Sequence, residues 1–248
     1  MNLEQVLYHF KTKIIQLCSY FEFSSNLLDR IRLNKRSSRV NPDKSNMSNE
    51  ILNLIKSLNI QAHPMFGTLL SIYRDKSFIY ADDYDFALFG GEQLNKEFIN
   101  KLSEKGAILT AYSVVNDEKL VELSFIYKDV RIDFFSLSEV NLEIVHECPN
   151  FRKERPLLEF GDVRIRNYNS YFVVSYPKFD LVLDEKWGVY LPDKCEEIFS
   201  KHYGSDWKTP KKSNFIDFES YDFIQGHSYN VEGDSLILID MLEGRGLI

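Results

Sequence analysis

The chain has 248 residues, of which 44% are hydrophobic, and its formal net charge is -7 at pH 7. This length and hydrophobic content allow one buried core, either as one domain or as a core with a smaller addition. The net negative charge argues against a dedicated nucleic-acid-binding protein, because neutralising phosphates normally requires a basic surface.

The cysteines and the N-terminal sequence indicate the compartment. Cys18, Cys148 and Cys195 lie far apart and form no C-x-x-C pair, which predicts neither a disulfide framework nor a structural zinc site. Polar residues, among them Glu4, are spread through Met1–Lys13, and nowhere do about eighteen apolar residues follow one another, so we predict no signal peptide and no membrane-spanning helix. We therefore expect a cytoplasmic protein with reduced thiols.

The N-terminal third begins with helical patterns. Apolar residues three and four positions apart predict an amphipathic helix over most of residues 1–28. Arg30–Lys44 is basic and rich in Ser, Asn and Pro, which predicts an exposed linker; contact with anionic lipid or a phosphorylated acceptor is the alternative. The apolar spacing of residues 51–58 predicts a second helix that leads into a strand at Gln61–Phe66.

The next stretch carries the first chemical signal. A small turn at Gly67-Thr68 precedes helical spacing in Leu69–Arg74, and a β-rich segment with Asp83 and Asp85 follows. Because side chains alternate along a strand, the two acidic side chains leave the same face, with Cβ atoms roughly 6.5 to 7 Å apart. Such a pair suits one or two divalent cations, and a solvated edge strand is the alternative.

A predicted helix and a meander follow the acidic strand. We expect a helix over Gln93–Lys105, and then strands at Ile108–Val115, Leu120–Tyr127 and Val130–Phe135. Asp133 falls in the last strand, on the face opposite to its large apolar neighbours. A carboxylate in that position is either at the mouth of a site or badly placed.

The C-terminal part shows weaker patterns. Val163–Arg166 alternates like a strand, and Tyr171–Val174 is expected to pair with it. Prolines precede two predicted helices, over Lys178–Trp187 and Asp193–His202, which we expect to close over the site. Residues 214–248 show no sustained period, except for a strand-like or helical stretch at Leu236–Leu242. The whole order of elements argues for an α+β domain with a mixed sheet and helical flanks at both ends.

Three acidic residues are candidate metal ligands. If Asp83, Asp85 and Asp133 converge, their repulsion would be severe without a cation, and Mg²⁺ takes carboxylate oxygens together with substrate phosphates. One or two ions would hold a nucleotide pyrophosphate and stabilise the leaving group of an in-line displacement. The Gly67-Thr68 turn would offer backbone N–H groups, a hydroxyl and a helix N-terminus to phosphate oxygens.

Further residues are candidates for substrate binding. Arg74 would clamp phosphate through two hydrogen bonds, and pairing with an acid such as Asp75 is the alternative. Lys186 is a candidate phosphate ligand. Tyr203 and Trp207 would line a sugar or base pocket, since aromatic rings stack on such groups, whereas a core tryptophan is the alternative.

Together these motifs resemble the signature of the LicD and fukutin family. The run GTLLSIYRDKSFIYADDYDFAL resembles its Gly-Thr-Leu-Leu, arginine, aromatic turn and Asp-x-Asp series. RIDFF around Asp133 resembles its third acidic strand, and Tyr190–Pro210 resembles its closing element, so the likeness spans about Gln61–Pro210. Tyr84 stands where the family often has an aliphatic residue, and Ser71 where a glycine is common; neither change removes a ligand.

The resemblance implies a fold and an activity. It implies a nucleotidyltransferase fold of the polymerase β type, with a short mixed sheet, flanking helices and helical additions at both ends. The expected organisation is an N-terminal helix and basic linker in residues 1–45, a catalytic core in 46–140 and a closing part in 141–248. The implied enzyme uses Mg²⁺ or Mn²⁺ to transfer ribitol phosphate, glycerol phosphate or phosphocholine from a CDP-activated donor to a cell-surface glycan or its precursor.

The resemblance also implies roles and partners. Asp83 and Asp85 become the first metal ligands, Asp133 the third and a candidate base, and Gly67-Thr68 the turn that contacts phosphate. The implied partners are the CDP-activated donor and a glycan or glycolipid acceptor, with peripheral contact to the inner face of a membrane or to a synthesis complex, and no nucleic acid. The alternatives are nucleotidyl transfer to a small hydroxyl or amine, and a non-catalytic glycan- or nucleotide-binding partner.

Overall fold

The computed structural model describes residues 44–78, 83–90, 93–152, 157–211 and 216–248. Its helices are α3 (Lys44–Ser57), α4 (Phe66–Arg74), α5 (Lys96–Glu104), α6 (Cys195–Tyr203), the short η2 (Phe218–Ser220) and α7 (Ser235–Gly244). Its strands are β1 (His63–Pro64), β2 (Asp83–Phe89), β3 (Ile108–Val115), β4 (Lys119–Tyr127), β5 (Val130–Val140), β6 (Glu143–Pro149), β7 (Leu157–Phe160), β8 (Val163–Pro177), β9 (Leu181–Asp184), β10 (Val189–Pro192) and β11 (Asp222–Gly233). Two predictions lie outside the described residues: the helix in residues 1–28 and the linker up to Asp43. Asp82 also lies outside them.

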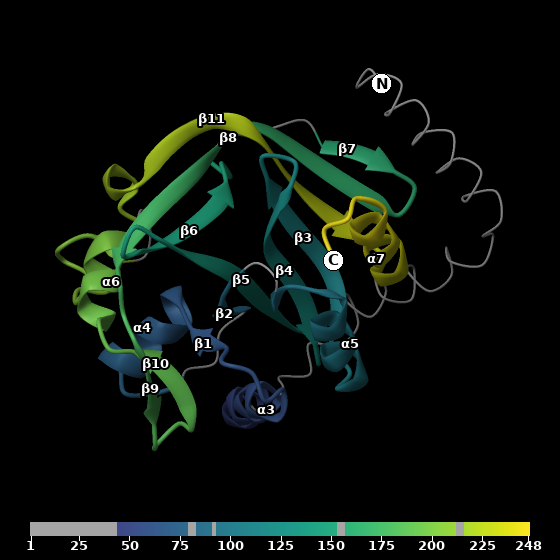
Figure 1. The fold of residues 1–248 in the computed structure, drawn as a ribbon. Coiled ribbons are helices and arrows are strands. Elements are labelled where there is room, and N and C mark those ends of the chain that lie inside the picture. Colours follow the sequence, from purple (N-terminus) through teal and green to yellow (C-terminus); the bar gives the residue numbers. More distant parts are fainter. Residues whose placement is uncertain (1–43, 79–82, 91–92, 153–156, 212–215) are drawn as a thin grey trace. The chain divides into compact units, whose positions relative to one another are not determined.

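A large mixed sheet dominates the fold. In the described part of the chain, nine strands form it in the order β1-β2-β5-β4-β3-β11-β8-β6, with β7 paired to β8. The pair β2–β5 is parallel and the other neighbours are antiparallel. The last residues of β5, Leu137–Val140, also pair with β6, so the pairings close a ring of β5, β4, β3, β11, β8 and β6 (Figure 1). The α+β class and the mixed sheet are confirmed, and the sheet is larger than the short one expected.

Tight turns connect the strands of the meander. Asn116-Asp117 between β3 and β4, and Lys128-Asp129 between β4 and β5, have positive φ angles at both residues. Asn141-Leu142 between β5 and β6 shows the same feature. Two consecutive left-handed residues match the right-handed twist of paired strands, which is why short loops suffice here. The predicted meander is confirmed, although β5 runs on to Val140 where a strand ending at Phe135 was expected. The hairpin to β6 crosses the boundary expected between residues 140 and 141.

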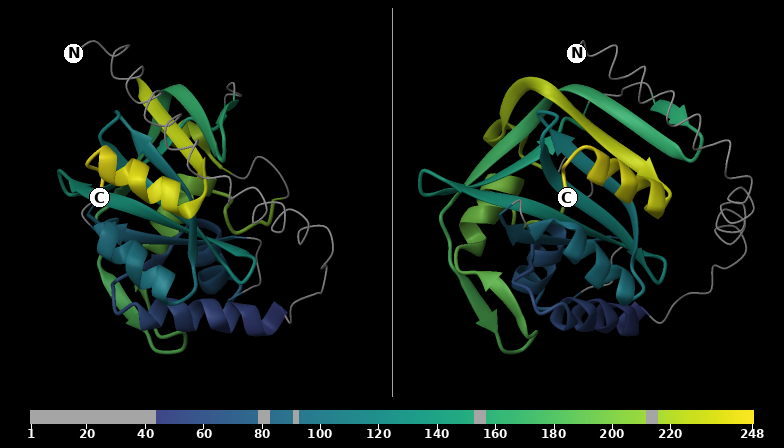
Figure 2. Two further views of the ribbon diagram at one scale, coloured as in Figure 1. Left: turned by 90° about the vertical axis from the view of Figure 1, so that its right-hand side faces the viewer. Right: turned by 45° about the vertical axis from the view of Figure 1, so that its right-hand side comes forward.

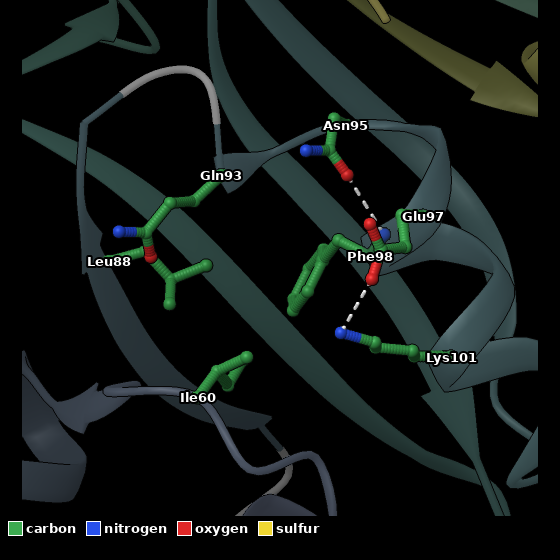
Figure 3. A pocket seen from close by; sticks show the side chains of 7 residues that line it. All are labelled: Ile60, Leu88, Gln93, Asn95, Glu97, Phe98 and Lys101. Carbon is green, nitrogen blue, oxygen red and sulfur yellow. Dashed lines mark hydrogen bonds and ion pairs between the residues drawn. The ribbon is translucent and has the colours of Figure 1, made fainter.

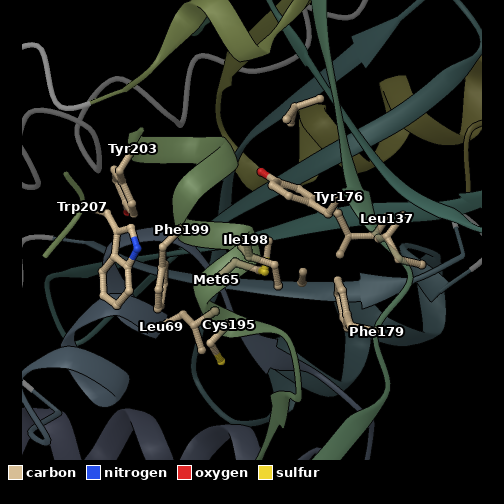
Figure 4. Close-up of a cluster of buried hydrophobic side chains, with 13 residues drawn as sticks. Met65, Leu69, Leu137, Tyr176, Phe179, Cys195, Ile198, Phe199, Tyr203 and Trp207 are labelled. Atoms are coloured by element: carbon tan, nitrogen blue, oxygen red, sulfur yellow. The ribbon is translucent and has the colours of Figure 1, made fainter. Parts of the chain in front are cut away.

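Helices cover both faces of the β2–β5 region. On one face, α4 and α6 pack on Ala87, Leu137 and Tyr176 and form a cluster of buried apolar side chains (Figure 4). On the other face, Phe98 of α5 lies edge-on to Phe134, with ring centroids 4.9 Å apart. Helix α7 packs on β3 and β11 (Figure 2). Within the described ranges, no helix combines the length and apolar character needed to cross a membrane.

The prediction of a helix over Lys178–Trp187 is wrong. This segment forms β9 and a turn, and β9 pairs with β10 as an antiparallel hairpin. The Asp184 carboxylate accepts a hydrogen bond from the Trp187 backbone N–H at 2.9 Å, and Gly188 adopts a φ of 62°. A proline signal for a helix start is local, and here strand pairing with Val189–Pro192 overrides it.

The structure also corrects the predicted ends of other strands and helices. Val163–Arg166 and Tyr171–Val174 do not pair with each other, because both belong to the single strand β8, which pairs with β6, β7 and β11. The strand expected at Gln61–Phe66 shrinks to His63–Pro64, since Phe66 already begins α4. The helix expected over Gln93–Lys105 begins only at Lys96.

The closing helix is the best-predicted C-terminal element. Helix α6 covers Cys195–Tyr203, so it begins two residues later and ends one residue later than expected, and it ends at Gly204, whose φ of 87° favours glycine. The tail without a clear pattern contains β11 and α7, and α7 begins at an Asp234 cap. Residues 44–248 form one compact unit.

Candidate functional site

Strand β2 carries the first two acidic candidates. Asp83 and Asp85 lie two positions apart in this strand, so their side chains leave the same face, as the alternation predicts. The intervening Tyr84 and Phe86 are buried on the other face, and the Tyr84 hydroxyl lies 3.0 Å from Ser48 Oγ. The apolar face therefore sets the orientation of the strand and leaves the acidic face toward α4.

The neighbouring strand β5 brings in the third acid. In the parallel register of β2 and β5, Asp85 is opposite Asp133 and Asp83 is opposite Arg131. Side chains in register on adjacent strands project to the same face of the sheet. The structure thus brings Asp83, Asp85 and Asp133 together, although β5 lies two hairpins further along the chain.

The start of α4 lies directly against Asp85. The backbone N–H of Asp85 donates to Thr68 Oγ1 at 2.8 Å, and the N–H of Met65 donates to the Asp85 carbonyl at 3.0 Å. A methyl group added at Gly67 would lie 4.0 Å from Asp85 Oδ2, an ordinary contact, so space alone does not require glycine. Phe66 begins the helix with a φ of 46°, which is uncommon for a bulky residue.

The Thr68 hydroxyl therefore has a structural partner. The sequence predicted it as a phosphate ligand, whereas in the structure it is buried and connects α4 to β2. A hydroxyl that accepts one hydrogen bond can still donate its own proton, so the phosphate role stays a prediction. What the structure shows is that the first turn of α4, whose N–H groups have no partner within the helix, lies beside the acidic strand.

Two further charged residues complete the site, and the sequence reading missed both. Arg131 Nε donates to Asp133 Oδ1 at 2.8 Å, and Arg131 Nη2 donates to Ser124 Oγ at 3.0 Å. Glu122 on β4 accepts from the Ser113 hydroxyl at 2.7 Å and lies 3.6 Å from Arg131 Nη2. Arg131 could have been found in the sequence because it lies two positions from Asp133 in the same strand. Glu122 could have been found because it is the single acid in the apolar strand β4.

Burial and repulsion dominate the electrostatics of the acids. Burial, followed by the charges of Asp133, Asp83 and Glu122, raises the pKa of Asp85 well above its usual value. Burial and the charge of Asp133 raise the pKa of Glu122 to about 7. Burial also raises the pKa of Asp133, although Arg131 acts in the opposite direction. The site therefore gathers more acidic groups than its guanidinium can stabilise in their charged form, and such strongly shifted groups are frequent at functional sites.

No ready-made metal cage exists in the described ranges. There, no group of three or more His, Cys, Asp or Glu side chains is arranged to hold a metal ion. The three candidate acids share a face and adjacent strands, but Asp133 is turned to Arg131. The three carboxylates offer the oxygen ligands that Mg²⁺ or Mn²⁺ prefers, but their side chains would have to change rotamer to reach a common ion.

The remaining predicted substrate residues have partners elsewhere. Arg74 makes two hydrogen bonds to Asp75, at 2.8 and 3.0 Å, which is the alternative that the sequence left open. Lys186 Nζ donates to the Lys76 carbonyl at 3.0 Å.

The two aromatic candidates of the closing element are core residues. Tyr203 and Trp207 are 7% and 6% exposed, and both rings pack on Phe199, Trp207 with a centroid distance of 4.8 Å (Figure 4). A stacking role for either ring would require this cluster to open. Burial raises the pKa of Tyr203, and the nearby carboxylate charge of Asp85 adds to this rise.

No family model and no curated protein sequence matches this chain. The resemblance to the LicD and fukutin family therefore stays a prediction from the motifs.

A small pocket lies on the opposite side of β2. It is lined in part by Ile60, Leu88 and Phe98, and Asn95 caps α5 beside it by accepting from the Phe98 N–H at 3.0 Å (Figure 3). Leu88 is an odd number of positions from Asp85 along the strand, so the two side chains leave opposite faces. This pocket is therefore separate from the acidic site.

Proposed function

We propose that the protein transfers a phosphorylated small molecule from a CDP-activated donor to a cell-surface glycan or its precursor, with the help of Mg²⁺ or Mn²⁺. One arrangement supports this proposal: Asp83, Asp85 and Asp133 lie on adjacent strands beside the N-terminus of α4. Carboxylate oxygens suit hard divalent cations, and the N–H groups of a helix start suit phosphate. The motif order that resembles the LicD and fukutin family favours the CDP-activated donor.

The three carboxylates of Asp83, Asp85 and Asp133 would hold the ion. Their fit is one of chemistry, since the set is all oxygen and shares one face, and a cation would favour the charged form of Asp85 and Asp133, whose pKa values burial and neighbouring acids raise. Such an ion would supply positive charge that offsets the negative charge of the donor phosphates and of the leaving group.

The chain's own groups would orient the reaction. The first-turn N–H groups of α4, at Gly67 and Thr68, would contact the diphosphate of the donor. The acceptor hydroxyl oxygen forms a bond to the phosphorus that carries the small molecule, while the bond from that phosphorus to the bridging oxygen breaks and CMP leaves. The hydroxyl proton goes to a base, for which Asp133 is the candidate because it lies beside Asp85 on the same face.

Release of CMP tests this proposal directly. The full chain is incubated with Mg²⁺ and with CDP-choline, CDP-ribitol or CDP-glycerol in turn, with and without glycan acceptors. We expect one donor to yield CMP, and we expect Asp85→Asn to abolish the release while circular dichroism shows a folded protein. Asp117→Asn is the matched control, because Asp117 lies in the exposed turn between β3 and β4 and pairs with His227.

The products distinguish the alternatives. If no donor yields CMP under any acceptor condition, the proposal loses its main support. If an NTP is consumed and the mass of the acceptor rises by an NMP group, the same acids serve nucleotidyl transfer instead. Retained turnover in Asp85→Asn would also rule out the assigned site.

A further inference from the structure

Arg131 connects the acidic residues through one guanidinium group. Its Nε donates to Asp133 Oδ1 at 2.8 Å, and its Nη2 donates to Ser124 Oγ at 3.0 Å and lies 3.6 Å from Glu122 Oε1. In the parallel register it is also opposite Asp83. A planar guanidinium suits several acceptors at once, because its N–H groups point in fixed directions.

The exposure of these side chains shows which one can leave. The Arg131 side chain is 45% exposed, whereas the side chains of Asp133 and Glu122 are only 7% and 9% exposed. The guanidinium therefore covers the carboxylates from the solvent side. A long side chain in this position can swing into water without opening the core, whereas the buried acids cannot leave.

We infer that Arg131 is an exchangeable counterion, which holds Asp133 and Glu122 while no metal ion is bound and is displaced when a divalent cation binds the acidic residues. This inference rests on the proposed function, because it takes the acids of β2 and β5 as the metal ligands. It also accounts for the turned side chain of Asp133, since Oδ1 is engaged by Arg131 and an entering cation has to compete for it.

Titration calorimetry of the full chain with Mg²⁺ tests the exchange. In Arg131→Gln, we expect the Kd for Mg²⁺ to fall about tenfold, because the charged hydrogen bonds of the guanidinium no longer have to be broken. Arg166→Gln is the matched control, since it removes the same charge and an ion pair of 2.7 Å to Glu232, away from the acids. We expect its Kd to equal that of the wild type. Arg131→Lys keeps the charge without the planar group and should give an intermediate Kd.

A charge-balanced variant covers the case in which Arg131→Gln does not fold. The double variant Glu122→Gln, Arg131→Gln removes one charge of each sign, and its Kd should be about tenfold below that of Glu122→Gln alone. An unchanged or higher Kd on removal of Arg131, in either background, overturns the inference.

The same titrations separate this inference from the proposed function. If the wild type binds Mg²⁺ and Asp85→Asn does not, the metal site stands, and the Arg131 variants then decide the inference by themselves. If neither the wild type nor Arg131→Gln binds Mg²⁺, the metal site and the exchange both fail.

Discussion

Replacing Glu122 with glutamine should change the pH dependence of stability in a direction that the structure determines. Glu122 is buried and accepts a hydrogen bond from Ser113, and its carboxylate lies close to the charge of Asp133. Burial and that neighbouring charge raise its pKa from 4.5 to about 7. Glutamine has the same shape and can keep the hydrogen bond of the Ser113 hydroxyl, but it never ionises.

The sign follows from the protons that each state binds. Below a pH of 4.5, Glu122 is protonated in both the folded and the unfolded chain and contributes no pH dependence. Between 4.5 and about 7, the unfolded chain loses this proton while the folded protein keeps it, so the free energy of unfolding falls as the pH rises. One pKa unit corresponds to about 1.4 kcal/mol, so the loss from this group is on the order of 3 kcal/mol once the pH exceeds the folded pKa.

Urea unfolding of both proteins over this range measures the effect. Relative to the wild type, Glu122→Gln should be about equally stable near pH 4 and more stable by roughly 3 kcal/mol near pH 8. Glu139→Gln is the control for net charge, because that side chain is 46% exposed and pairs with Lys178. A stability difference that is independent of pH, or a Glu122→Gln protein that is less stable at high pH, would refute the reasoning.

Three other substitutions test the packing around the site, each by urea unfolding. Thr68→Val should lower the free energy of unfolding by about 1 to 2 kcal/mol, because the part-buried Asp85 N–H loses its acceptor, whereas Thr68→Ser should be nearly neutral. Trp207→Ala should cost about 3 to 5 kcal/mol, since it empties a buried space beside Phe199; a loss below 1 kcal/mol, on the order of a surface change, would speak against a core position. Gly204→Ala should cost about 1 to 2 kcal/mol because of the φ of 87°, and an unchanged stability would contradict that backbone conformation.

The errors of the sequence reading have a common physical cause. The segment Lys178–Trp187 has a proline before it and was assigned as a helix, yet Leu181–Asp184 pairs with β10. Val163–Arg166 and Tyr171–Val174 were assigned as two paired strands, yet both lie in β8. In each case the structure depends on strands that pair with the segment. The propensity of the segment's own residues gives no information about those strands.

The sequence by itself determined what depends on local geometry. Strand alternation put Asp83 and Asp85 on one face, and the helix expected over Asp193–His202 matches α6 to within two residues at each end. Only the tertiary structure decided that Asp133 lies beside Asp85. It also decided that the Arg131 guanidinium contacts both Asp133 and Glu122. The reason is that strand register, burial and the resulting pKa values depend on residues brought together from distant parts of the chain, which no local pattern specifies.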